Sequence, residues 1–194
     1  MIKNKKILIV GGGIAGPALA IYCHRLGAQV EVLEARKESD LEEGLFMGIS
    51  PNGLRVLSDL IDINQLHQEY APGAINFFNA KGRRIAGLET SYQLEKYGFE
   101  SIQVKRSAIS RLLHKELIKR NIPVHYGSSI ISLPKENQQI IPVTDSGNHP
   151  PVDLVFGADG IHSRCRRLIF PFSPKPKYTK QLSTGSIVSM PGCF

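Results

Sequence analysis

Apolar runs alternate with a helical pattern at the start of the chain. The segment KKILIV at residues 5–10 is rich in β-branched residues and is typical of a buried strand, and AQVEVLEA at 28–35 is a second apolar strand pattern. Between them, apolar residues recur at helical spacing and predict one buried helix face, formed by Leu19, Tyr22, Cys23 and Leu26. Because Gly27 supplies a stop for this helix, the pattern predicts a β-α-β unit.

The turn between the first strand and the helix carries the glycine spacing G-x-G-x-x-G. Gly11 permits a tight turn, Gly13 lets the backbone approach a pyrophosphate, and Gly16 lets the helix lie close to the strand. Phosphate would rest on the helix N-terminus, where N–H groups lack intrahelical partners and the helix dipole is positive. The candidate phosphate-binding residues are therefore Gly11, Gly13, Ile14, Ala15 and Gly16.

An acidic residue closes the second strand. Glu34 follows the glycine motif at roughly the 20-residue offset expected of a ribose-binding carboxylate, with Ala35 and Arg36 directly after it. A carboxylate there would accept hydrogen bonds from ribose hydroxyls and repel a 2′-phosphate, so NADP is a poor candidate for this particular site. The motif does not separate NAD from FAD.

The same N-terminal segment has an alternative interpretation as a secretory signal. Three lysines precede an uncharged stretch from Ile7 to Cys23 that contains Ala18-Leu19-Ala20. A signal peptide needs neither phased glycines nor a downstream acid, which favours the dinucleotide site. A membrane span is disfavoured because the stretch is shorter than about 20 apolar residues and is broken by glycines and a proline.

The remaining patterns continue a mixed α/β chain. INFFNAKGRRIAGLE predicts a hairpin with its turn at residues 80–82, NIPVHY predicts a strand, and residues 135–151 predict hairpin loops. A helix beginning near Arg106 should bury an apolar stripe of Ile109, Leu112, Leu113 and Leu117. A last strand, VDLVF, delivers Asp159 to its carboxyl end, where ligands bind in open α/β sheets.

Four segments together resemble one flavoprotein family. They are the glycine motif with VLEAR, then GLFMGISPNGLRVLSDL, then VKRSAISRLLHKEL, and finally GADGIHSRCR. In this combination the chain resembles the FAD-dependent aromatic hydroxylases, the single-component flavoprotein monooxygenases related to p-hydroxybenzoate hydroxylase. The resemblance implies a Rossmann-like FAD-binding domain of the glutathione reductase type, joined to a mainly β substrate-binding domain.

The resemblance also implies roles for particular residues. Gly48 would lie in the loop beside the flavin, and Arg106 would contact the cofactor, although Arg106 taken alone reads as a solvated cation at a helix start. Asp159, with Gly160 beside it, would assist binding of both FAD and NAD(P)H as reductant. The whole enzyme would insert one oxygen atom of O₂ into a small organic, often aromatic, substrate. No residue of this chain is assigned a catalytic role.

Matching the family along the chain predicts two domains. Residues 1–73 and 100–170 would form a discontinuous FAD-binding domain, and residues 74–99 and 171–194 would form part of a substrate-binding sheet. The resemblance extends over the N-terminal half of the family only. We therefore expect a truncated or split form, with a second chain as one possible source of the other half.

The charge, cysteine and histidine content of the chain limits the classes of partner and ligand that we expect. The net charge of +7, from 24 basic and 17 acidic residues, is scattered and lacks interleaved aromatics, so nucleic acid is not expected as a partner. The three cysteines are far apart, which argues against a disulfide framework and fits a reducing, cytoplasmic setting. The six histidines show no metal-ligand spacing, so no metal is expected.

Two alternatives to a monooxygenase portion stay open. One is a non-catalytic dinucleotide-binding module, or the remnant of a decayed gene. The other is an NAD-dependent enzyme built on the same β-α-β unit, against which the GADG segment at 157–160 counts.

Overall fold

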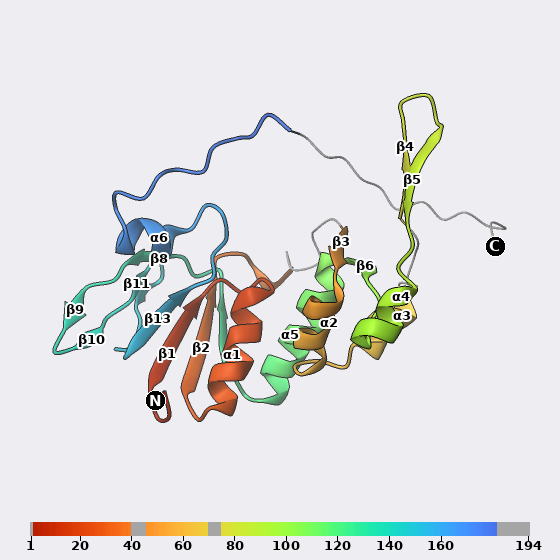
Figure 1. The fold of residues 1–194 in the computed structure, drawn as a ribbon. Helices are drawn as coiled ribbons and strands as arrows, with labels where there is room; N and C mark the ends of the chain where they lie inside the picture. The colour runs from red at the N-terminus through yellow and green to blue at the C-terminus, as the bar shows by residue number, and fades with distance from the viewer. Residues whose placement is uncertain (1, 40–45, 70–74, 182–194) are drawn as a thin grey trace.

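A computed structural model describes residues 2–39, 46–69 and 75–181. Its centre is a parallel sheet of four strands in the order β13-β1-β2-β7, which runs through the middle of three layers. The strands are β1 (Lys6–Val10), β2 (Gln29–Glu34), β7 (Val124–Tyr126) and β13 (Leu154–Gly157). All neighbouring pairs are parallel, so the carboxyl ends of the strands gather along one edge (Figure 1).

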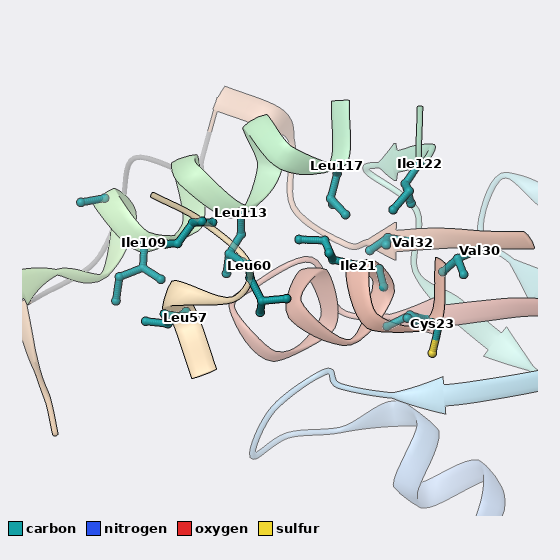
Figure 2. Close-up of a cluster of buried hydrophobic side chains, with 14 of the residues drawn as sticks. Ile21, Cys23, Val30, Val32, Leu57, Leu60, Ile109, Leu113, Leu117 and Ile122 are labelled. Carbon is teal, nitrogen blue, oxygen red and sulfur yellow. The ribbon is translucent and has the colours of Figure 1, made fainter. Parts of the chain in front are cut away.

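Helices cover one face of this sheet. Side chains of β1 and β2 pack there against α1 (Ala15–Arg25), α2 (Pro51–Ser58) and α5 (Arg106–Lys119). Figure 2 shows this core, in which Leu113 and Leu117 of α5 approach Ile21 of α1. The predicted stripe on α5 is confirmed, since Ile109, Leu113 and Leu117 are buried and Leu112 is half-buried.

The predicted apolar face of α1 is partly wrong. Leu26 is 63% exposed, whereas Ala20 and Ile21 are fully buried. The close approach of Gly16 to the glycine turn decides which face meets the sheet, so the buried positions follow Gly16 at helical intervals. Gly27 does end the helix: its φ is +81°, and its N–H donates to the carbonyl of His24 at 2.9 Å.

Short antiparallel strands cover the other face of the sheet. A three-stranded sheet in the order β12-β11-β8 and a separate β9-β10 hairpin account for the predicted hairpin loops. Their bounds are β8 (Ile130–Ser132), β9 (Lys135–Glu136), β10 (Gln139–Ile140), β11 (Val143–Thr144) and β12 (Gly147–Asn148). A smaller core there joins Leu8, Leu33 and Ile130 to Cys165 of α6 (Arg164–Ile169).

The remaining elements lie beside and beyond this body. β3 (Phe46–Ile49) pairs with β6 (Ile102–Lys105), next to α3 (Asn64–Glu69) and α4 (Tyr92–Tyr97). The predicted hairpin is confirmed as β4 (Ile75–Phe78) and β5 (Arg84–Leu88), and it projects away from the rest of the molecule (Figure 1). Within the described ranges, no helix combines the length and apolarity needed to cross a membrane.

Candidate functional site

Three chain segments meet at the carboxyl edge of the parallel sheet. The Gly11 N–H donates to the carbonyl of Leu33, and the Ala158 N–H donates to the carbonyl of Val10, each at 2.7 Å. These bonds tie the glycine turn to the ends of β2 and β13. A cavity of about 490 Å³ opens there, a volume within the range of small-molecule and cofactor sites.

Most of the residues predicted from sequence line this cavity. They are Gly11, Gly13, Glu34, Ala35, Arg36, Arg106, Asp159 and Gly160. Ile14, Ala15 and Gly16 lie just behind the wall, at the start of α1, and do not line it. Gly48 also lies outside the lining, on β3, where it pairs with Gln103.

The glycine loop is shaped by contacts that exclude side chains. Gly11 has a φ of +115°, and a Cβ on it would stand 2.4 Å from the carbonyl oxygen of Ala158. A Cβ on Gly16 would stand 1.8 Å from the carbonyl oxygen of Gly11. The N-terminus of α1 has no side-chain cap and no acidic residue in its first turn, which leaves backbone donors and a positive dipole end suited to an anion.

Glu34 holds the glycine loop through both carboxylate oxygens. Its Oε2 accepts from the Gly12 N–H at 2.6 Å, and its Oε1 accepts from the Arg36 N–H at 2.9 Å. Each carboxylate oxygen can accept more than one hydrogen bond, so half-buried Glu34 keeps capacity for a hydroxyl donor in the cavity.

Arg106 begins α5 and is half-buried at the cavity wall. Its Nη2 lies 3.0 Å from where a Cβ on Gly13 would be, so the guanidinium lies against the glycine loop. With Arg36 and Arg164, three arginines line the cavity against two carboxylates, Glu34 and Asp159. This excess of positive charge suits a ligand that carries phosphates.

A buried histidine, which the sequence reasoning missed, fixes the loop from behind. His114 of α5 places Nε2 2.6 Å from the carbonyl oxygen of Gly12 and Nδ1 2.7 Å from the hydroxyl of Tyr126. Since a carbonyl only accepts, Nε2 carries the proton, and in the neutral ring the tyrosine hydroxyl donates to Nδ1. Burial, followed by the charges of Glu38 and Glu34, raises the pKa of Tyr126 and keeps this donor protonated.

Asp159 accepts hydrogen bonds at the start of α6, which its sequence motif did not indicate. Its Oδ2 accepts from the N–H groups of Arg164 and Cys165 at 2.6 and 3.1 Å, and its Oδ1 accepts from the Ser163 hydroxyl at 2.5 Å. The carboxylate therefore stabilises the start of α6 while it lines the cavity. Burial, with the Asp159 charge second, raises the pKa of the Cys165 thiol to about 12.

Several polar cavity residues were also missed. They include Ser107 and Ser110 on α5 and Ser128 and Ser129 after β7, besides His162 and Arg164 after Asp159. A usable signal existed for Ser110, because it follows Arg106 by four residues and so shares its helix face. The second pair follows a parallel strand at its carboxyl end, the same position that singled out Glu34 and Asp159.

The fold and the cavity together define an α/β dinucleotide-binding domain of the Rossmann-like type. Residues 4–183 match a family model described as FAD binding domain. The chain therefore belongs to this FAD-binding family, and its resemblance to the flavoprotein monooxygenases is confirmed by relatives with that printed activity.

Two such relatives give the extent of the match. The FAD-dependent monooxygenase esdpE of Penicillium shearii is 34% identical over 165 residues, which are 84% of this chain and 34% of that protein. A flavin-dependent monooxygenase of Legionella longbeachae is 29% identical over 177 residues, 88% of this chain and 43% of that protein. The chain thus spans well under two thirds of their length and corresponds to their FAD-binding portion.

Solved structures share the fold. CtdE in complex with FAD has a TM-score of 0.69 at 24% identity, covering 85% of this chain and 40% of that one. The p-nitrophenol 4-monooxygenase PnpA of Pseudomonas putida has a TM-score of 0.76 at 17% identity, covering 88% of this chain and 44% of that one. The predicted fold class is confirmed.

Proposed function

We propose that the cavity binds FAD, with Glu34 accepting from the adenosine ribose hydroxyls and the glycine loop receiving the pyrophosphate. The observation that carries this proposal is the meeting of the glycine loop, Glu34, Arg106 and Asp159 around one cavity from four separated segments. Arg106, packed against Gly13, is positioned to neutralise phosphate or flavin oxygens. His114 keeps the loop in shape, and Asp159 and Gly160 form part of the cavity wall.

We infer an activity for the whole protein from its family. Bound FAD would supply redox chemistry and oxygen activation, and the protein's own residues would hold it and exclude water from its reactive end. We propose NAD(P)H as reductant and a small organic, possibly aromatic, molecule as substrate. The printed activities of the monooxygenase relatives support this assignment.

The division into domains extends the same proposal. Residues 1–73 and 100–170 would hold FAD, and residues 74–99 and 171–194 would belong to the substrate-binding sheet. Of these ranges, residues 1, 40–45, 70–74 and 182–194 lie outside the residues that the structure describes. Support comes from the β4–β5 hairpin, which projects away from the dinucleotide-binding body, and from the described residues 171–181, which leave it as an extended segment (Figure 1). Gly48 lies on β3, which pairs with β6, the strand that leads directly into Arg106. From this position it would face the flavin end of the cofactor rather than its adenosine end.

Arg106 provides the test of the binding site. Arg106→Ala should raise the Kd for FAD about tenfold to a hundredfold, because a hydrogen bond to a charged group contributes about 1.5–3 kcal/mol. Arg111→Ala is the matched control, since Arg111 is an exposed arginine on the same helix and does not line the cavity. Fluorescence titration with FAD measures both. Equal affinities in the two variants would remove Arg106 from the site.

The reductant is tested separately on the FAD-loaded protein. Under anaerobic conditions, addition of NADH or NADPH should bleach the visible absorbance of the oxidised flavin. Retention of FAD without bleaching by either nucleotide would instead favour the alternative of a non-catalytic dinucleotide-binding module.

A further inference from the structure

A second polar cluster lies on the sheet face opposite α1. Glu31 is on β2, His125 is on the neighbouring strand β7, and His149 directly follows β12. Their ligating atoms all lie within 4.8 Å of one another. None of the three lines the FAD cavity, and both histidines line a separate pocket of about 290 Å³.

The strand register brings the first two residues together. His125 pairs with Leu33, and Glu31 precedes Leu33 by two residues, so all three side chains share one face of the sheet. The Nε2 of His125 lies 2.7 Å from Oε2 of Glu31, and the Nε2 of His149 lies 3.2 Å from the same oxygen. The His149 side chain is only 9% exposed, and its ring meets His125 edge-on at 5.7 Å between centroids.

Both ring nitrogens of His149 face oxygen atoms that can only accept. Its Nδ1 lies 3.0 Å from the carbonyl oxygen of Pro150 and its Nε2 lies 3.2 Å from Glu31, so a neutral ring, which carries one proton, can donate to only one of them. When that proton is on Nδ1, Nε2 presents a lone pair toward the Glu31 carboxylate. In this tautomer the two acceptors need a cation between them, either an additional proton on His149 or a metal ion. A backbone carbonyl on the second ring nitrogen is the arrangement found behind metal-binding histidines.

We propose that Glu31, His125 and His149 form a binding site for a divalent transition metal of the Zn²⁺ class. Two imidazoles and one carboxylate are a known three-residue donor set for Zn²⁺, and the open pocket leaves room for water as fourth ligand. Ligand atoms in a tetrahedral zinc site stand about 3.4 Å apart, given bond lengths near 2.1 Å. The His149–Glu31 separation of 3.2 Å is close to this value, and His125 must move back from Glu31 by about 0.7 Å, which its 44% exposed side chain permits.

The site would link parts of the fold that are distant in sequence. A bound ion would join strands β2 and β7 of the parallel sheet to the segment that connects β12 to β13. Because β13 leads directly into Asp159, the ion would stabilise the layer that supports one wall of the FAD cavity without contacting FAD. Its predicted effect is therefore on folding stability rather than on flavin affinity.

The test is titration of the tag-free chain, loaded with FAD, with ZnCl₂ by calorimetry and thermal unfolding. We expect one Zn²⁺ per chain and a rise in Tm on binding. His125→Ala and His149→Ala should each weaken binding more than ~100-fold, beyond the effect expected from losing an outer-shell partner. His24→Ala, on α1 and outside the cluster, should bind like the parent.

Two results would overturn the proposal. One is no saturable Zn²⁺ binding by the parent chain at micromolar metal, which would leave an imidazolium–carboxylate pair as the explanation of the cluster. The other is equal binding by His125→Ala and His24→Ala. Should the buried His149 variant fail to fold, His125→Ala and Glu31→Gln decide the question, because both side chains are at least 40% exposed. FAD content, measured in the same samples, separates this result from the test of the cofactor site.

Discussion

Replacement of Glu34 by alanine tests the most specific part of the cofactor proposal. The substitution removes the acceptor of the Gly12 N–H at 2.6 Å and of the Arg36 N–H at 2.9 Å, together with the proposed bonds to ribose. Loss of charge-assisted bonds to the ribose should cost about 1–3 kcal/mol of binding energy. The Kd for FAD should therefore rise roughly fivefold to 150-fold.

The same substitution should also destabilise the free protein. Gly12 is buried, and leaving its N–H without a partner costs about 1–3 kcal/mol of unfolding free energy. Glu34→Gln separates the two effects, because its amide oxygen can still accept from Gly12 while the negative charge is gone.

Fluorescence titration with FAD and urea unfolding measure the two quantities on the same preparations. Glu38→Ala is the matched control, since Glu38 is exposed and does not line the cavity. An unchanged FAD affinity in a folded Glu34→Ala protein would refute the ribose assignment, whatever its stability.

Two further predictions concern the loop and the wall of the cavity. Gly16→Ala should lower the free energy of unfolding by about 1–3 kcal/mol, because its Cβ meets rigid backbone 1.8 Å away. The Cβ of Gly13→Ala meets only the tip of Arg106, so this variant should weaken FAD binding and leave the fold intact. Equal loss of stability of the two variants in urea unfolding would contradict this. Cys165, with its pKa raised to about 12, should be alkylated at pH 8 more than ~100-fold slower in the folded chain than in urea, as followed by mass spectrometry. The contribution of the protonated Cys165 thiol to folding stability is fully present below the ordinary thiol pKa and is lost as pH rises toward 12. Alkaline rather than acidic solutions should therefore accelerate the modification.

Local patterns predicted the elements that depend on local chemistry. The β-α-β unit, the β4–β5 hairpin and the apolar stripe of α5 could all be predicted, because strand alternation, turn residues and helical spacing depend on only a few neighbouring residues. The position of Glu34 could be predicted for the same reason, because the length of one β-α-β unit fixes its distance from the glycine turn. The placement of β13 beside β1 is not local and needed the structure.

The contacts between distant segments could not be predicted from spacing. His114 supports Gly12 across 102 positions, and His149 approaches Glu31 across 118. The expectation of no metal site rested on the spacing of the histidines along the sequence. Such spacing says nothing about residues that adjacent strands bring together. The predicted face of α1 was partly wrong because close packing at Gly16, rather than the count of large apolar side chains, orients that helix.

The most direct test of the account is titration of the folded, flavin-free chain with FAD, followed by displacement with ADP. We predict saturable uptake of one FAD per chain, displacement by ADP because its ribose and phosphates occupy the Glu34 and glycine-loop end, and weaker displacement by ADP that carries a 2′-phosphate. A chain that is folded by circular dichroism yet leaves added FAD free in solution would contradict the central claim, as would bound FAD that ADP does not displace.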